Sequence, residues 1–186
     1  SQLYIMRGNA YKNSNRVKES INDYTLAYNL NDPETQEMAA VYRAGAYIDD
    51  GQLETAERDL KELMTSKDED VRKNAQMRLA IISVQQKKQD QAIQTYLELY
   101  KSAKDETEKL NFLRNLVQLS FLSKDWKHVD EFNTMMIESP EAEGKKVENQ
   151  EFYYKEVAMF NLALAYEAQG DTIKAKNWLI QGYKAF

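Results

Sequence analysis

The chain has 186 residues, of which 42% are hydrophobic and 30% charged, and its formal net charge is −5. This balance is typical of a soluble folded protein, and it argues against disorder and against a basic face that could grip nucleic acid or anionic lipid. The absence of cysteine excludes disulfides, thiolate metal sites and cysteine nucleophiles, and it leaves cytoplasmic and periplasmic locations both compatible.

No apolar run approaches the roughly 18 residues needed to cross a bilayer, so we expect no direct membrane insertion. Residues 1–10 show neither a basic start nor an apolar stretch, which predicts that no signal peptide is present. The chain opens on Ser1 and directly in a helical pattern, so we expect a processed product or one segment of a longer array.

Apolar residues recur at three- and four-residue steps along most of the chain, which predicts amphipathic helices. Turn residues divide these helices into five pairs. In chain order the predicted helices cover about 2–12 and 16–30, 34–49 and 53–65, 69–87 and 91–102, 106–122 and 126–137, and 151–169 and 172–185.

Local signals mark where some of these helices start. Asp32-Pro33 predicts a helix near Glu34, with aspartate at the N-cap and proline at the first helical position. Either Ser66 or Asp68 is expected to cap the helix that follows. An irregular stretch at 139–149 separates the fourth pair from the fifth, and Ser139-Pro140 is expected to start a short turn there that Gly144 ends.

Small residues return at a nearly constant distance near the start of each second helix. They are separated by 36, 36, 37 and 46 residues, and they are Ser20, Ala56, Ala92, Val129 and Ala175. Paired helices repeating at such intervals predict an all-α fold of the α-solenoid type. We therefore expect a single repeat domain over 1–186, with units at about 1–33, 34–68, 69–105, 106–138 and 150–186 and an irregular connection at 139–149.

The first unit carries the most complete set of small and aromatic positions, namely Tyr4, Gly8, Tyr11, Ser20, Tyr24 and Ala27. The other units repeat parts of this set in one register. In this pattern the chain resembles the tetratricopeptide repeat family, although Arg7 stands where that family usually has leucine. The resemblance implies about five repeats in a right-handed superhelix, in which small residues let paired helices approach and tyrosines fill the holes between pairs.

The resemblance also implies a concave groove lined by first helices, in which a peptide or helix of another protein would lie. The groove residues expected here are Asn9, Lys12, Tyr42, Arg78, Arg114, Asn115, Gln118, Phe121, Phe160 and Asn161. Asparagine can bond backbone amides and arginine can clamp carboxylates. Packing between first helices, or an arginine on the surface without a role, is the alternative reading of such positions.

Two other functions remain open at this point. The chain could be a structural subunit of a larger assembly, for instance a bacterial envelope or secretion assembly, with contacts through its ends or convex face. It could also be a helical accessory region of a larger enzyme or regulator. We expect Trp178, Tyr183 and Phe186 on or near outer faces of the last helix, which predicts self-association or chain continuation through that helix.

No catalytic constellation is visible in the sequence. His128 is the only histidine, and the acidic groups Asp49-Asp50 and Asp68-Glu69-Asp70 stand at helix ends, where capping explains them. No phosphate-binding loop, serine elbow or zinc motif occurs. We therefore expect a non-enzymatic adaptor or scaffold without cofactor or metal, whose partner is a protein or peptide rather than nucleic acid.

Overall fold

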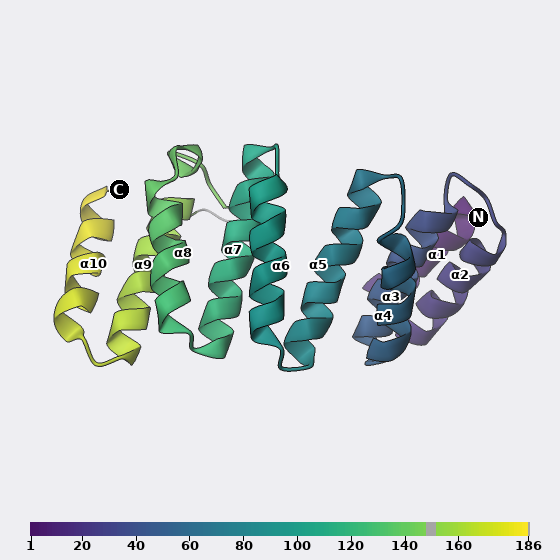
Figure 1. Cartoon of the computed structure of the whole chain (residues 1–186), viewed down its shortest axis with the longest axis horizontal. Coiled ribbons are helices and arrows are strands. Elements are labelled where there is room, and N and C mark those ends of the chain that lie inside the picture. Colours follow the sequence, from purple (N-terminus) through teal and green to yellow (C-terminus); the bar gives the residue numbers. More distant parts are fainter. Residues whose placement is uncertain (148–151, 186) are drawn as a thin grey trace. The chain divides into compact units, whose positions relative to one another are not determined.

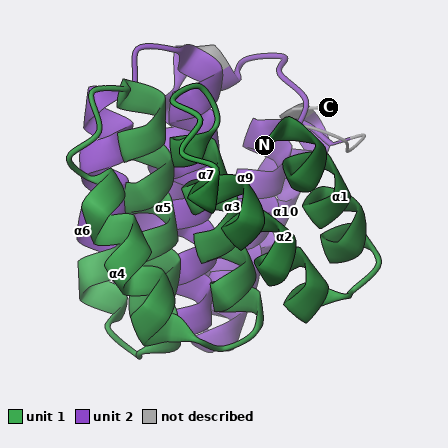
Figure 2. Ribbon diagram, turned by 90° about the vertical axis from the view of Figure 1, so that its right-hand side faces the viewer, with its two compact units in different colours: residues 1–92 green, residues 93–186 purple. Residues whose placement is uncertain are grey.

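The computed structural model describes residues 1–147 and 152–185. This part of the chain contains ten α-helices joined mostly by short turns (Figure 1). They form two compact units, residues 1–92 and residues 93–186, which are shown in different colours in Figure 2. The predicted all-α fold of paired helices is confirmed in each unit.

Unit 1 consists of five helices and the first residues of a sixth. The helices are α1 (Gln2–Asn13), α2 (Val17–Asn29), α3 (Gln36–Asp49), α4 (Leu53–Leu63), α5 (Glu69–Gln85) and the start of α6 (Gln89–Ser102). From α1 to α5 each helix packs against the next one in the chain, and α3 also packs against α5. First helices of successive pairs therefore meet within this unit.

Unit 2 holds the remainder of α6 and four further helices. These are α7 (Glu106–Ser123), α8 (Trp126–Glu138), α9 (Tyr154–Ala168) and α10 (Thr172–Ala185), with a 3-10 turn η1 (Pro140–Ala142) after α8. From α7 to α10 each helix again packs against its successor. The predicted start of the ninth helix at Glu151 lies outside the described residues, as does Phe186; every other predicted helix end falls within two residues of the observed one.

The same turn closes every pair of helices. One residue between the two helices has a positive φ; these residues are Asn15, Gly51, Lys87, Lys124 and Gly170. Their separations are 36, 36, 37 and 46 residues, which is the repeat interval of the small residues. In the first turn the amide of Arg16 donates to the carbonyl of Tyr11 at 2.8 Å, five residues back, and the other four turns contain the equivalent bond.

The start of α3 differs from the prediction. The helix begins at Gln36 rather than near Glu34, because Asp32 anchors a turn instead of acting as a simple cap. Its carboxylate accepts from the amide of Glu34 at 3.1 Å and from the hydroxyl of Ser1 at 2.5 Å. The Ser1 bond spans 31 residues and ties the start of α1 to this turn.

The start of α5 agrees with the prediction. The Asp68 carboxylate accepts from the amide of Asp70 at 2.8 Å, as expected of an N-cap. Ser66 contributes as well, since its hydroxyl accepts from the amide of Asp68 and donates to Glu37 on α3. Both residues that were candidates for the cap therefore take part in it.

The described residues of the stretch after α8 form more local structure than the sequence predicts. The short turn at Pro140–Ala142 is confirmed, and Gly144 follows it with a φ of +60°. Lys146 then forms an isolated antiparallel bridge with Tyr153, and its ammonium lies 5.6 Å from the centre of the Tyr153 ring. Ala142 and Val147 are buried, so this stretch contributes apolar side chains to unit 2. The end of the predicted irregular stretch, 148–149, lies outside the described residues.

The small residues allow the close approach that their repetition predicts. All of the following are buried: Gly8, Ser20, Ala44, Ala56, Ala80, Ala92, Ala163 and Ala175. The tightest case joins α1 to α2, because a Cβ on Gly8 would lie 2.6 Å from Cε1 of Tyr24. Tyr24 is fully buried, so its ring has little room to move away.

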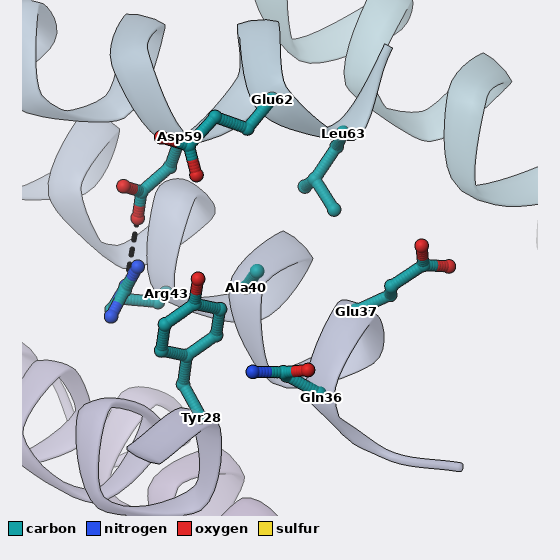
Figure 3. Close-up of a pocket in the computed structure, with 8 residues that line it drawn as sticks. All are labelled: Tyr28, Gln36, Glu37, Ala40, Arg43, Asp59, Glu62 and Leu63. Carbon is teal, nitrogen blue, oxygen red and sulfur yellow. Dashed lines mark hydrogen bonds and ion pairs between the residues drawn. The ribbon is translucent and has the colours of Figure 1, made fainter. Parts of the chain in front are cut away.

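An ion pair between the two helices of a pair occurs twice in unit 1. Arg7 on α1 donates to Asp23 on α2 at 2.6 Å, and Arg43 on α3 donates to Asp59 on α4 at 2.7 Å. Figure 3 shows the second pair at the edge of a small cavity of about 190 Å³, with Tyr28 beside the guanidinium. Arg7, which departs from the leucine of the resembled family, thus stands in register with Arg43 and has a defined partner.

A methyl group at Gly8 tests the close approach of α1 and α2. Gly8→Ala should lower the free energy of unfolding by about 2 kcal/mol, because the buried Tyr24 ring would have to shift. Gly182→Ala is the matched control on α10, since its Cβ would lie an ordinary 3.6 Å from Cβ of Met159. The control should raise stability by about 0.5 kcal/mol, as expected for Gly→Ala within a helix. Equal effects of the two substitutions in chemical denaturation would contradict the packing described here.

Candidate functional site

Four of the predicted groove residues lie in unit 1, on its first helices. Asn9 and Lys12 are on α1, Tyr42 is on α3 and Arg78 is on α5. Tyr42 and Arg78 are separated by 36 residues and therefore occupy equivalent positions in successive pairs. All four side chains are partly buried, as expected of residues that line a groove and unlike fully solvated surface residues.

Tyr24 of α2 connects two of these residues. Its hydroxyl donates to Oδ1 of Asn9 at 2.7 Å, and its ring stacks on Tyr42 with centroids 5.7 Å apart. Burial, together with the neighbouring Tyr42 hydroxyl, raises the pKa of Tyr24 to about 12. Tyr24 is therefore a neutral donor at physiological pH, and it holds the Asn9 amide in one orientation.

Asp49 connects the other two residues. Nζ of Lys12 on α1 lies 2.9 Å from Oδ2 of Asp49 at the end of α3. This ion pair therefore joins the first helices of successive pairs. The same carboxylate acts on Arg78 electrostatically and favours its charged form. The sequence marks Asp49 only as a residue near a helix end, and its place between two cations depends on packing that no local pattern reveals.

Arg78 is the least satisfied polar group of this cluster. Its guanidinium lies against Gly45 of α3, where a Cβ would collide with Nη1. Burial is the largest effect on the group and lowers its pKa, while Asp49, Tyr42 and Tyr24 offset this only in part. Within the described residues, the buried Nε has no hydrogen-bond acceptor. A buried N–H donor without a partner costs free energy, so its presence calls for an explanation.

We call Asn9, Lys12, Tyr42, Asp49 and Arg78 the unit 1 cluster. The cluster contains two cations and one carboxylate, so its local charge is positive although the chain is acidic overall. It offers N–H donors from asparagine, lysine and arginine beside an aromatic ring. Such a set can receive carboxylate or carbonyl oxygens of a polypeptide; it contains no nucleophile paired with a base.

The predicted groove residues of unit 2 are less closely grouped. Arg114 and Asn161 line one small cavity of about 130 Å³ between α7, α8 and α9. Asn161 donates to Asn133 at 3.2 Å, and Asn133 in turn donates to the carbonyl of Val129. Asn161 is therefore tied to a buried network that fixes its amide.

The remaining predicted residues of unit 2 have other surroundings. Phe121 packs edge-to-face on Trp126 at 6.1 Å, Asn115 is partly buried and Gln118 is exposed. Phe160 is also exposed, and it lines a different hollow on α9 and α10. The structure thus brings Arg114 and Asn161 to one cavity and places Phe160 at another.

Two further kinds of site are absent from residues 1–147 and 152–185. No three histidine, aspartate or glutamate side chains gather in this part of the chain in a way that could hold a metal ion. None of the helices described there has both the length and the apolar character needed to span a membrane.

Comparison with solved structures shows the fold in other proteins. TPR-like repeats of a Podosopora anserina protein described as a kinesin light chain match with a TM-score of 0.74 at 14% identity, covering 98% of this chain and 93% of that one. A single-residue variant of that protein matches with a TM-score of 0.72 at 16% identity, covering 98% and 92%. BtubC from P. vanneervenii matches with a TM-score of 0.64 at 18% identity, covering 96% and 74%. At these identities the likeness concerns the fold alone.

Comparison with protein families identifies the repeats. No curated protein sequence matches the chain. A family model described as a tetratricopeptide repeat-like domain matches residues 4–109, and a second one, described as a tetratricopeptide repeat, matches residues 156–185. The first match alone spans more than half of the 186 residues. The predicted α-solenoid class is therefore confirmed, and the chain belongs to the tetratricopeptide repeat family.

Proposed function

We propose that this chain is a protein-binding scaffold that holds an extended segment of another protein on the first helices of unit 1. The family supports the general role, since tetratricopeptide repeats typically serve as non-catalytic surfaces for protein–protein interaction. The specific observation that supports the location is the buried Nε of Arg78, which finds no acceptor among the described residues. The atom has almost no accessible surface, so an acceptor supplied by a partner would satisfy it after the Arg78 side chain turns outward.

The chemistry of the unit 1 cluster favours a carboxylate as that acceptor. A guanidinium and a carboxylate form short charge-assisted hydrogen bonds, and burial strengthens them because the surroundings have a low dielectric constant. Lys12 adds a second cation, which Asp49 binds directly, while the same carboxylate only favours the charged form of Arg78 from a distance. Asn9, oriented by Tyr24, is positioned to bond a backbone amide of the same segment.

In unit 2, taken by itself, Arg114, Asn115, Gln118, Phe121 and Asn161 remain candidates for contacts with a polypeptide. Arg114 follows Arg78 by 36 residues and therefore has the equivalent place in the next pair. Asn161 already donates a hydrogen bond to Asn133 within unit 2, so its amide would meet a partner in a fixed orientation. Phe160 is exposed and could contact an apolar side chain.

A display library of random peptides, presented to the full chain, tests this proposal. Peptides enriched by the chain should contain Asp, Glu or a free C-terminal carboxylate, and Arg78→Gln should weaken their binding by about tenfold or more, since it removes a charge-assisted bond. Arg58→Gln is the matched control, because Arg58 is an exposed arginine on a second helix, α4. Gly45→Ala should weaken binding too, because its methyl displaces the guanidinium without changing the charge. Equal binding by the chain and by Arg78→Gln would refute the proposal.

The same residue should carry a measurable cost in stability. Arg78→Met should raise the free energy of unfolding by about 1 kcal/mol, because it removes a buried cation whose Nε is unpaired while keeping an apolar stem. Arg43→Met should lower it by about 3 kcal/mol, because Asp59 would lose its partner while only 13% of its side chain is exposed. Thermal or chemical unfolding of the two variants measures this contrast, and a loss of stability in Arg78→Met would show that the arginine is structural.

A further inference from the structure

The packing of α2 against α3 shows how one helix pair of this chain receives the next. Tyr24 of α2 stacks on Tyr42 of α3, and the fully buried Ala27 and Ala39 share one apolar cluster. Beside them, the guanidinium of Arg43 lies over the ring of Tyr28, 4.2 Å from its centre. These three contacts make up a seam between successive pairs.

The helix α10 repeats the α2 side of this seam but leaves it open. With Ala175 aligned on Ser20, the seam residues of α2 correspond to Leu179, Gly182 and Tyr183. Leu179 is 50% exposed and Tyr183 is 90% exposed, whereas Tyr24 and Ala27 have no exposed surface. Together with Phe160 and Trp178, these residues line a hollow of about 830 Å³. We call Leu179, Gly182 and Tyr183 the α10 face.

The helix α1 repeats the α3 side of the same seam. With Gly8 aligned on Ala44, the residues Ala39, Tyr42 and Arg43 correspond to Leu3, Met6 and Arg7. Leu3 is 81% exposed and Met6 is 64% exposed, and with Tyr4 and Arg7 they line a second open hollow. We call Leu3, Met6 and Arg7 the α1 face. Large exposed apolar residues on both faces are typical of surfaces that another molecule covers.

We propose that the α1 face of one copy of this chain packs on the α10 face of a second copy and reproduces the α2–α3 seam. In this arrangement Met6 lies on Leu179 as Tyr42 lies on Tyr24. Leu3 is larger than Ala39, and the opposing Gly182 is smaller than Ala27, so the added volume on one face meets added space on the other.

Arg7 supplies the most specific part of the match. Arg43 binds Asp59 and covers the Tyr28 ring at the same time, so one guanidinium serves both contacts. Arg7 binds Asp23 in the same way and has only more distant rings of its own helix beside it, Tyr4 at 5.4 Å and Tyr11 at 5.9 Å. Tyr183 of the second copy would take the place of Tyr28. The Arg7 side chain is 54% exposed while that of Arg43 is 11% exposed, which is the difference that an aromatic cover would remove.

The two faces are different surfaces, so the contact is heterologous. Each copy that uses its α1 face still offers its α10 face, and association continues beyond a dimer. The unit 1 cluster takes no part in this contact. The inference therefore stands apart from the binding function proposed above and can be tested without a ligand.

Sedimentation velocity over a concentration series of the full chain tests the proposal. The weight-average mass should rise with concentration past twice the 21.7 kDa of one chain. Met6→Glu and Leu179→Glu should each remain monomeric, because each variant has one blocked face. Both positions are exposed, so the introduced carboxylates should leave the fold intact.

Mixing the two blocked variants gives the sharper result. Met6→Glu keeps its α10 face and Leu179→Glu keeps its α1 face, so an equimolar mixture should form a dimer and nothing larger. Tyr183→Leu should weaken association of the otherwise unchanged chain by about fivefold, through loss of the contact with Arg7.

Ile173→Glu is the matched control for these variants. Ile173 is an apolar residue of α10 that is 75% exposed, and it aligns with Lys18, which is exposed on α2 although α2 packs against α3. The control should associate as the unchanged chain does. A chain that stays monomeric at all concentrations would overturn the proposal. The α1 and α10 faces would then be surfaces for helices other than those of a second copy. Association of Met6→Glu with itself would overturn it as well, because it would show a symmetric contact through α10.

Discussion

The turn between the two helices of a pair sets the geometry on which the other contacts of this chain depend. A residue with positive φ reverses the backbone. The backbone N–H that follows it donates a hydrogen bond to the carbonyl five residues back, and this bond ties the start of the second helix to the end of the first. Because this turn recurs, equivalent residues of different pairs face one another in the same way. Arg7 meets Asp23 as Arg43 meets Asp59, and the small residues fall where the helices approach most closely.

Much of the fold could be predicted from the sequence because its determinants are local. Apolar spacing and turn residues place each helix, and the constant repeat interval shows that the helices form pairs. What could not be predicted depends on residues far apart in the chain. Asp32-Pro33 predicts a helix start. The Ser1 hydroxyl, 31 residues away, instead helps Asp32 to form a turn, so that α3 begins only at Gln36. The bridge between Lys146 and Tyr153 likewise has no local signal.

The candidate site likewise has features that follow from the repeat spacing and features that depend on distant contacts. The repeat register alone places Tyr42 and Arg78 at equivalent positions, so their appearance on one surface of unit 1 follows from spacing. The burial of Arg78 does not follow from spacing, because it depends on the direction of a long side chain and on the absence of a Cβ at Gly45. The same limit applies in unit 2, where Arg114 and Asn161 share a cavity that Phe160 does not reach.

A repeated architecture also creates the possibility of register errors while the chain folds. Helix α2 packs against two first helices, α1 and α3, which carry Arg7 and Arg43 at equivalent positions. Charge alone therefore does not determine which of the two arginines pairs with Asp23. The fit between Tyr24 and Gly8 does, because the position equivalent to Gly8 on α3 is Ala44, whose methyl group would occupy the space that the tyrosine ring needs. The missing side chain at position 8 thus disfavours a pairing of α2 that is displaced by a whole repeat.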